Sequence, residues 1–227
     1  MKSSTKENVF IQGDLVYLRR PITEKDVVNG DWHQWFNDYE ITKFLVHGVF
    51  PNDRESQMKI VEDQLKNRSS LILSIVDNQS DEMIGVISLK NIDLINRNAE
   101  IGIVMGFQKV AGAAVEAMAL LTQHAFDRLN LIKLYAGQHE GIWKWVNTLE
   151  TIGYKIEGVR RNAGIRDGKV YDTVLTGITN EDYYKLKSMY DGKIFDSIAN
   201  LFSRKRRENL IPDLKAHFQK ITEGDKQ

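Results

Sequence analysis

The sequence predicts an α+β fold: a mixed, mostly antiparallel seven-stranded sheet flanked by helices, with a helical C-terminal extension. Two observations predict this class. Segments with strand character and segments with helical periodicity alternate as far as about residue 180, and polar turn clusters separate three successive strands in the middle of the chain. Beyond that point only helical patterns occur.

The N-terminal third contains the first strand and the first helices. Residues 1–12 are largely polar, and we expect them to be flexible. A strand is expected over residues 15–21, where a proline ends it because proline lacks the N–H that a sheet needs. A helix start is expected at residues 23–26, and apolar residues at helical spacing predict helices within residues 32–45 and 56–65.

Strands dominate the middle of the chain. They are expected over residues 70–76, 83–89 and 99–105. Clusters of turn residues at 77–81 and 96–98 separate them. Since short polar loops join antiparallel neighbours, we expect these three strands to pair in antiparallel fashion.

The hydrophobic period changes after the third of these strands. Residues 113–129 are rich in alanine and leucine and predict a long helix, followed by a short strand at 132–136. A second helix is expected over residues 143–152, with a glycine as its C-cap. The last two strands are expected at 154–158 and 169–178, joined by an Asp-Gly turn.

These elements define one expected domain over residues 13–180. Residues 181–227 form the helical C-terminal extension, whose helices can cover an open sheet edge or pair two subunits. A homodimer through this extension is therefore an expected assembly. We expect the basic cluster at residues 204–207 to be a solvated helix face.

The composition excludes several functions. The chain has no cysteine, which rules out disulfides, thiolate zinc sites and cysteine nucleophiles, and we expect no metal site. Basic and acidic residues number 31 each, so no net field attracts nucleic acid, and no nucleic-acid partner is expected. No run approaches the roughly 18–20 apolar residues of a membrane span, and the first residues lack a signal peptide. We expect no membrane partner and a cytoplasmic location.

The junction between the strand at 99–105 and the helix at 113–129 has the chemistry of a phosphate site. Small residues fill the turn, so backbone N–H groups can approach an anion, while the helix N-terminus adds roughly half a positive charge. The segment is Lys109, Val110, Ala111, Gly112, Ala113 and Ala114. It has neither the Walker signature nor dinucleotide-fingerprint spacing. The alternative is an ordinary alanine-rich helix start.

This segment resembles the pyrophosphate-binding motif Arg/Gln-x-x-Gly-x-Gly/Ala of the GNAT N-acetyltransferase superfamily. Neighbouring segments are similar to that family in the same order. They are residues 99–103, like its fourth strand, 115–118, like its Thr-Glu-Ala-Leu helix start, 149–154, like its Leu-Glu-Lys-Leu-Gly-Phe, and 157–169, like its final hairpin. The resemblance covers residues 13–180 and is closest to the ribosomal-protein alanine and amino-sugar acetyltransferases.

The resemblance implies direct transfer of an acetyl group from acetyl-CoA to a primary amine in a ternary complex. We expect a small-molecule acceptor, most of all an amino-sugar nucleotide. The alternatives are a protein N-terminus, as in ribosomal-protein acetylation, and a non-catalytic module that binds CoA or a partner. The implied cofactor-binding residues are Val104, Met105, Lys109, Val110, Ala111, Gly112, Ala113 and Ala114.

Two residues are candidates for the general base, which keeps the attacking amine neutral. Glu100 heads the fourth strand, near where the resemblance places the acceptor, and His139 follows the fifth strand and titrates near neutrality. The alternatives are a carboxylate that only positions the substrate and a solvated loop histidine. Trp35, which shares a helix face with Trp32, and His47, in a loop able to cover the acceptor, are substrate-binding candidates. Core packing is the alternative for Trp35.

Lys109 replaces the usual Arg or Gln of the motif, and three further positions depart from the family pattern. Ile142 stands where many members have a CoA-contacting asparagine, and Trp145 stands where many have serine. Leu149 occupies the position of the tyrosine that several members use as general acid. The tyrosine mechanism therefore does not carry over, and these replacements motivate the non-catalytic alternative.

Overall fold

The computed structural model describes residues 8–107, 110–205 and 208–224. The chain divides into two compact units, Met1–Leu134 and Tyr135–Gln227, called here the first and the second unit. The boundary falls within the strand β6, which spans Lys133–His139.

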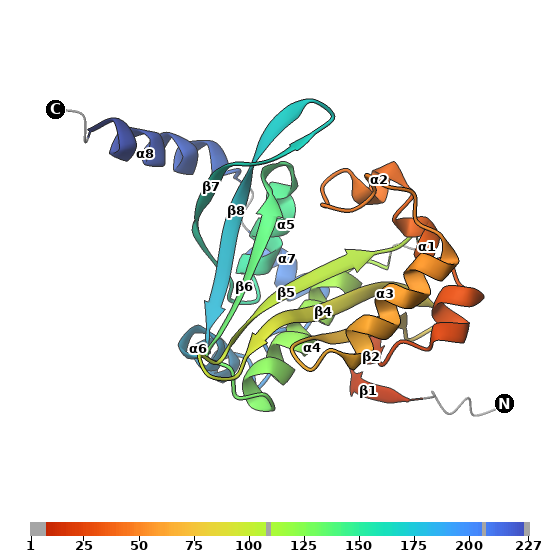
Figure 1. Cartoon of the computed structure of the whole chain (residues 1–227). Helices are drawn as coiled ribbons and strands as arrows, with labels where there is room; N and C mark the ends of the chain where they lie inside the picture. The colour runs from red at the N-terminus through yellow and green to blue at the C-terminus, as the bar shows by residue number, and fades with distance from the viewer. Residues whose placement is uncertain (1–7, 108–109, 206–207, 225–227) are drawn as a thin grey trace. The chain divides into compact units, whose positions relative to one another are not determined.

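The first unit contains a sheet of five strands in chain order, each antiparallel to the next. The strands are β1 (Val9–Gln12), β2 (Val16–Arg19), β3 (Leu71–Asp77), β4 (Met83–Asp93) and β5 (Asn98–Met105). Figure 1 shows β4 and β5 side by side. The antiparallel pairing expected from the turn clusters is confirmed.

The expected count of seven strands was wrong, because the described residues contain eight. The additional strand is β1, which lies entirely in the segment expected to be flexible. Val9 of β1 pairs with Arg19 of β2, so the open edge of β2 supplies backbone partners that the polar sequence does not reveal. Phe10 adds an edge-to-face contact with His124, with ring centroids 5.0 Å apart.

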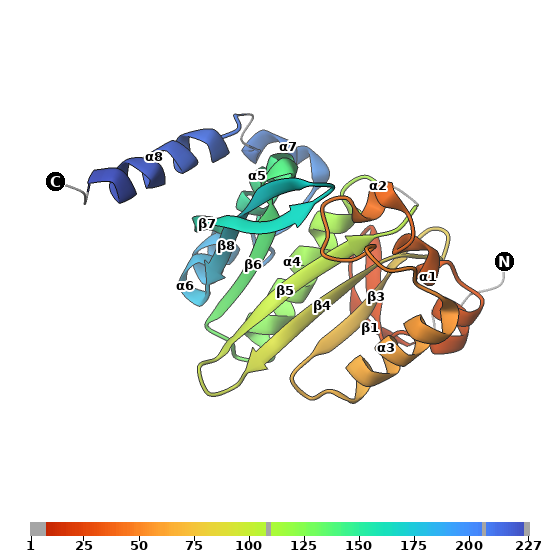
Figure 2. The same ribbon diagram turned by 45° about the horizontal axis from the view of Figure 1, so that its top comes forward.

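Helices cover both faces of the five-stranded sheet. They are η1 (Thr23–Val28), α1 (Trp32–Trp35), α2 (Tyr39–Thr42), α3 (Arg54–Lys66) and α4 (Ala113–Asp127). Figures 1 and 2 show α3 on one face of β4 and β5 and α4 on the other. The predicted helix positions are confirmed, although the segment at 32–45 forms two short helices rather than one.

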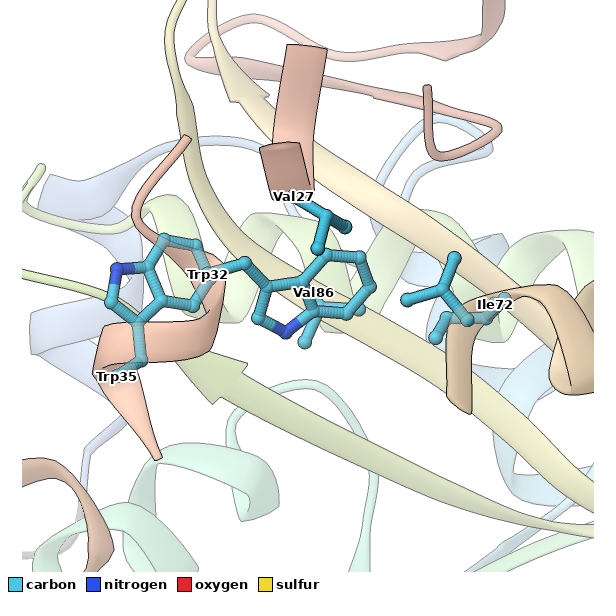
Figure 3. Packing of buried hydrophobic residues seen from close by; sticks show 6 residues of the cluster. Val27, Trp32, Trp35, Ile72 and Val86 are labelled. Carbon is cyan, nitrogen blue, oxygen red and sulfur yellow. The ribbon is translucent and has the colours of Figure 1, made fainter. Parts of the chain in front are cut away.

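A buried apolar cluster fixes α1 and α3 to the sheet. Figure 3 shows Trp32 lying over Val86 of β4, with Trp35 on one side and Ile72 of β3 on the other. Val27 of η1 closes the cluster, and all five side chains are buried. These contacts remove the aromatic residues from water and thereby set the position of the segment that follows α1.

A buried ion pair holds η1 against the same sheet. The Arg19 guanidinium donates to both carboxylate oxygens of Asp26, at 2.6 and 2.7 Å, and the side chains are 1% and 0% exposed. Asp26 also accepts from the Ser74 hydroxyl of β3 at 2.9 Å and from the Ile22 N–H at 2.8 Å. The four bonds satisfy a carboxylate that burial would otherwise destabilise.

A buried carboxylate fastens α4 to the turn that enters β2. Glu116, in the first turn of α4, accepts the backbone N–H groups of Asp14, Leu15 and Val16 at 2.7, 2.8 and 2.9 Å. The bonds fix where α4 begins relative to the sheet. They therefore help to place the junction at the start of that helix.

The second unit contains the remaining strands and helices. They are β6 (Lys133–His139), η2 (Glu140–Ile142), α5 (Trp143–Glu150), β7 (Lys155–Arg166), β8 (Lys169–Thr179), α6 (Asn180–Met189), α7 (Ile198–Arg204) and α8 (Ile211–Gly224). The strand β8 lies between β6 and β7, and β7 and β8 form the antiparallel hairpin visible in Figure 2. Gln138 of β6 bonds to Thr176 of β8 at 3.2 Å.

The α+β class, with a mostly antiparallel sheet flanked by helices, is confirmed. The expected helical extension is also present as α6, α7 and α8. No helix within the described ranges has both the length and the apolar character needed to span a membrane.

Candidate active site

The junction between β5 and α4 has the geometry that anion binding requires. Gly112 is the N-cap of α4, with φ 84° and ψ −15°, a left-handed conformation that favours glycine. It offers no side-chain acceptor, so the helix start has no side-chain cap. Ala113 donates its N–H to the Val110 carbonyl at 3.1 Å, which closes the preceding turn.

These features fit the pyrophosphate of CoA. The N-terminus of the 15-residue helix carries partial positive charge. Gly112 has no side chain, and Ala113 and Ala114 have only methyl groups, so an anion can approach the backbone. Val110 and Ala111 precede the cap and are partly or fully exposed. Lys109, the cation expected here from the sequence, lies outside the described residues.

The residues at the end of β5, just before this junction, contact side chains on both faces of the sheet. Val104 packs against the cluster of Trp32 and Trp35, whereas Met105 points to the opposite face, where its sulfur would meet a side chain at Gly85. Beyond Met105, a Cβ at Gly106 would lie 2.4 Å from the Trp35 ring. The indole therefore rests on the backbone immediately before the anion-binding loop.

Glu100 lies on the same sheet face as Val104, since the two residues are four positions apart on one strand. Its register partner is Lys90 of β4. A bulge follows Lys90, and there the Asn91 amide donates to the Glu100 carboxylate at 3.2 Å. Glu100 is partly exposed, so solvent reaches its carboxylate.

His47 lies in the loop after α2 and contacts the ring of Phe36, with centroids 4.9 Å apart. Partial burial lowers the pKa of His47, and the positive charge of Lys90 lowers it further. A Cβ at Gly48 would collide with Thr42, 2.5 Å from its hydroxyl oxygen, so this loop packs closely on α2. The contact with Phe36, which packs against the cluster of Trp32 and Trp35, places His47 beside the segment that contains α1.

His139 ends β6 and caps η2. Its Nδ1 accepts the Gly141 N–H at 2.9 Å, so the neutral ring carries its proton on Nε2. The imidazole stacks on Tyr171 of β8, with centroids 4.2 Å apart and planes at 28°. Burial lowers the pKa of His139, while the neighbouring Glu140 opposes that change.

Trp35, His47 and Glu100 all belong to the first unit, which also contains the junction between β5 and α4. Trp35 lies beside Gly106 at the end of β5, whereas Glu100 lies six residues earlier on the strand, roughly 20 Å away along it. His139 belongs to the second unit. Trp35 is 4% exposed, which fits its alternative role in the core.

Sequence reasoning missed four neighbours of the candidate residues. They are Phe36, Lys90, Asn91 and Tyr171. Lys90 could be identified only through the register of β4 against β5, which pairs it with Glu100. Tyr171 has none, because its contact with His139 depends on the pairing of distant strands.

The positions that depart from the expected pattern all lie at or in α5. Leu149 is fully buried, so a core side chain occupies the place where several family members have a tyrosine. Ile142 and Trp145 are half-buried. Within the described part of the chain, no group of three or more histidines and carboxylates is arranged to hold a metal ion.

The antiparallel strands β1 to β5, followed by helix α4 with its glycine-capped start, are the arrangement that the resemblance to acyl-CoA-dependent acetyltransferases predicts. Residues 16–155 match the family model described as the acetyltransferase (GNAT) domain. The chain belongs to this family and is an acetyl-CoA-dependent N-acetyltransferase. A curated relative, the uncharacterized N-acetyltransferase p20 of Bacillus licheniformis, is 25% identical over 153 residues, which cover 66% of this chain and 86% of the relative.

Solved structures have the same fold. The spermidine N-acetyltransferase of Vibrio cholerae, in complex with CoA and spermine, has a TM-score of 0.68 at 20% identity, covering 76% of this chain and 99% of that one. A GCN5-related N-acetyltransferase from Brucella melitensis has a TM-score of 0.67 at 21% identity, covering 90% and 93%.

Proposed function

We propose that this enzyme acetylates the primary amine of an anionic small molecule, an amino-sugar nucleotide. The observation that carries the choice of acceptor is the charge of the β7–β8 hairpin. Residues 158–172 contain the four cations Arg160, Arg161, Arg166 and Lys169 and the two carboxylates Asp167 and Asp172.

The distribution of these charges favours an anionic ligand. Asp172 is occupied within the protein, because it accepts the Asn162 N–H at 2.9 Å and pairs with Lys215 at 2.8 Å. Arg160, Arg161 and Lys169 are exposed on the hairpin. Tyr171, on the same hairpin, stacks on His139, so the cations belong to the element that contacts a candidate base. A phosphate-bearing acceptor gains from these charges and a polycation is repelled.

The anion-binding junction supports the role of acetyl-CoA as donor. The N–H groups at Gly112 and Ala114 would hold its pyrophosphate, with Lys109 adding charge, whereas the Ala113 N–H already donates to the Val110 carbonyl. Val104 and Met105 would lie along the pantetheine arm. Acetyl-CoA supplies an activated thioester. The amine nitrogen attacks the thioester carbonyl carbon, the C–S bond breaks, and CoA leaves as a thiolate that takes up a proton.

The amine proton must pass to a base. Glu100, partly exposed and hydrogen-bonded by Asn91, accepts it directly or through water in this proposal. His139 is the second candidate, although its Nδ1 already accepts a backbone N–H. Trp35 and His47 are proposed to border the acceptor, Trp35 from the core side and His47 from its loop.

A panel of acceptors tests this function. Thiol release from acetyl-CoA is measured with amino-sugar nucleotides, free amino sugars, spermidine and peptides with free N-termini. We expect the highest kcat/KM with an amino-sugar nucleotide, and the double variant Arg160→Gln, Arg161→Gln should raise KM for it while leaving an uncharged amine unaffected.

Other outcomes of the panel identify the alternatives. A preference for peptides indicates protein N-terminal acetylation, as in the ribosomal-protein branch, and a preference for spermidine indicates the substrate named for the Vibrio cholerae neighbour. CoA binding without thiol release from any amine indicates a non-catalytic module. Any of these results overturns the amino-sugar proposal.

The homodimer expected through the extension is a further proposal. Removing residues 191–227 and measuring the mass in solution tests it, and an unchanged oligomeric state argues against it.

A further inference from the structure

The C-terminal helix α8 is joined by one lysine to the two chain segments that carry the His139–Tyr171 stack. Lys215 Nζ lies 2.7 Å from Glu140 Oε2 and 2.8 Å from Asp172 Oδ2. Glu140 directly follows His139, and Asp172 directly follows Tyr171. A single ammonium group therefore bridges the residues next to both stacked rings.

The bridge closes into a small network of backbone and side-chain bonds. Glu140 Oε1 accepts the Asp172 N–H at 2.9 Å, and Asp172 Oδ1 accepts the Asn162 N–H at 2.9 Å. Each carboxylate thus uses one oxygen for the backbone and the other for Lys215. The hydroxyl end of Tyr171 also lies close to the backbone of β7, since a Cβ at Gly164 would lie 2.4 Å from the Tyr171 hydroxyl oxygen.

Apolar and backbone contacts place Lys215 at this position. Ile211, one turn earlier in α8, is buried with Val146 of α5 and Val174 of β8. Just before α8, the Asn147 amide of α5 donates to the Glu208 carbonyl at 2.9 Å. Figures 1 and 2 show that the first turns of α8 lie near β7 and β8 while its later turns run away from them. The start of the helix is therefore anchored.

The positive charge of Lys215 offsets the repulsion between two neighbouring carboxylates. Without Lys215, the carboxylates of Glu140 and Asp172 would repel each other across their shared backbone bond. Bonds to Asp172, then to Glu140, raise the pKa of Lys215. Burial would raise the pKa of Asp172, but the bonds from Lys215 and the Asn162 N–H, with the charge of Arg161, bring it below its ordinary value.

We propose that Lys215 is a positioning residue, through which helix α8 holds the His139–Tyr171 pair for the acetyl-transfer reaction. The role in the reaction rests on the proposed function, whereas the hold on His139 is a property of the second unit alone. The extension, which lies entirely outside the matched family segment, then contributes to the active site instead of only covering the sheet.

The test follows His139 by NMR titration of its ring, assigned with His139→Gln. Lys215→Met leaves the charge of Glu140 uncompensated, and that charge raises the pKa of His139, so we expect an upward shift of about half a unit. Glu140→Gln removes the same charge and should shift the pKa downward. Lys215→Arg restores the cation and should return the titration toward that of the wild type. Tyr171, Asp172 and Arg161, the other groups at this network, are unchanged in all three variants.

A matched control is Lys155→Met, which breaks the ion pair of Lys155 with Asp182, 2.5 Å long, in the same unit. It should leave the titration of His139 unchanged. If Lys215→Met does not fold with α8 in place, the downward shift in Glu140→Gln, compared with the wild-type titration expected for Lys215→Arg, still decides. An unchanged His139 titration in Lys215→Met and Glu140→Gln overturns the proposal.

Activity separates this proposal from the proposed function. With an active acceptor, Lys215→Met should reduce kcat about tenfold while KM for acetyl-CoA changes less than twofold, and Lys215→Arg should recover most of the loss. An altered titration with unchanged kcat overturns the role in the reaction. If the wild type acetylates no amine, the proposed function fails, and the titration alone decides whether Lys215 positions His139.

Discussion

The indole of Trp35 occupies the space that any side chain at Gly106 would need, with the ring Cε2 2.4 Å from the position of a Cβ. Trp35 is 4% exposed, and the Gly106 N–H donates to the Ile84 carbonyl at 2.8 Å, so neither partner can move easily. The last residue before the anion-binding loop is thus fixed by a core aromatic residue.

Gly106→Ala should therefore destabilise the protein by about 1–3 kcal/mol, because the methyl group displaces Trp35 or the strand end. It should also weaken CoA binding, since the loop begins at this residue. Denaturant unfolding and calorimetric CoA titration measure both effects. Gly102→Ala, on the same strand, is the control for stability, because its Cβ would meet only the Ser88 hydroxyl oxygen at 3.9 Å. Equal stability losses in the two variants contradict the prediction.

Gly112→Ala should weaken CoA binding about tenfold and destabilise the fold by about 1–2 kcal/mol. The reason is the left-handed conformation at φ 84°, in which a Cβ is strained and would stand where the pyrophosphate approaches. Gly192→Ala introduces the same strain at φ 83°, in open space beyond α6. It should cost similar stability without changing CoA affinity, and a comparable loss of affinity there would argue against the pyrophosphate site.

Glu116→Gln should lower the free energy of unfolding by about 2–4 kcal/mol, because three backbone N–H groups lose a charged acceptor and the amide cannot satisfy all of them. Urea unfolding at pH 7 measures the change. Glu62→Gln, which removes an exposed partner of Lys66 at 4.0 Å, is the matched control and should change stability by less than about 0.5 kcal/mol. Similar values for both would show that Glu116 does not anchor α4.

The pH dependence of kcat/KM should discriminate between the two candidate bases. Burial places the pKa of His139 below its ordinary value of about 6.5, so a rate that depends on its neutral form rises with pH and levels off at a lower pH than it would for an ordinary histidine. His139→Gln should then abolish this limb. If Glu100 is the base, Glu100→Gln should reduce kcat about a hundredfold or more while His139→Gln leaves the limb in place.

The lowered pKa of His139 also makes the free energy of unfolding depend on pH. Because folding lowers the pKa of His139, the neutral ring contributes stability above about pH 6.5, and that contribution is lost as the pH falls through the folded-state pKa. His139→Gln should therefore flatten the stability profile between about pH 5 and 7. Thermal unfolding across this pH range measures how stability changes with pH. An unchanged pH dependence in His139→Gln would contradict a lowered pKa for His139.

Local patterns were sufficient to predict much of the fold. Alternation and turn clusters predicted β3, β4 and β5, and the small residues beside Gly112 predicted the start of α4, because each depends on neighbours in the chain. The strand β1 was missed, since a four-residue strand is stabilised by the edge of β2 and not by its own pattern.

Glu100 and His139 could be selected by residue type and position, but their partners could not. Neither Asn91 beside Glu100 nor Tyr171 beside His139 has a sequence signal of its own. The bulge after Lys90 and the pairing of β6 with β8 bring them into contact.

By itself, the sequence determined the α+β class, the order of strands and helices and the glycine-capped junction, because hydrophobic period and glycine conformation act over a few residues. Only the tertiary structure decided which side chains meet across the fold. Glu116 and Val16 are 100 residues apart, and Lys215 and Glu140 are 75 residues apart. Such contacts depend on which faces pack together, and this depends on the summed burial of many side chains and not on any local spacing.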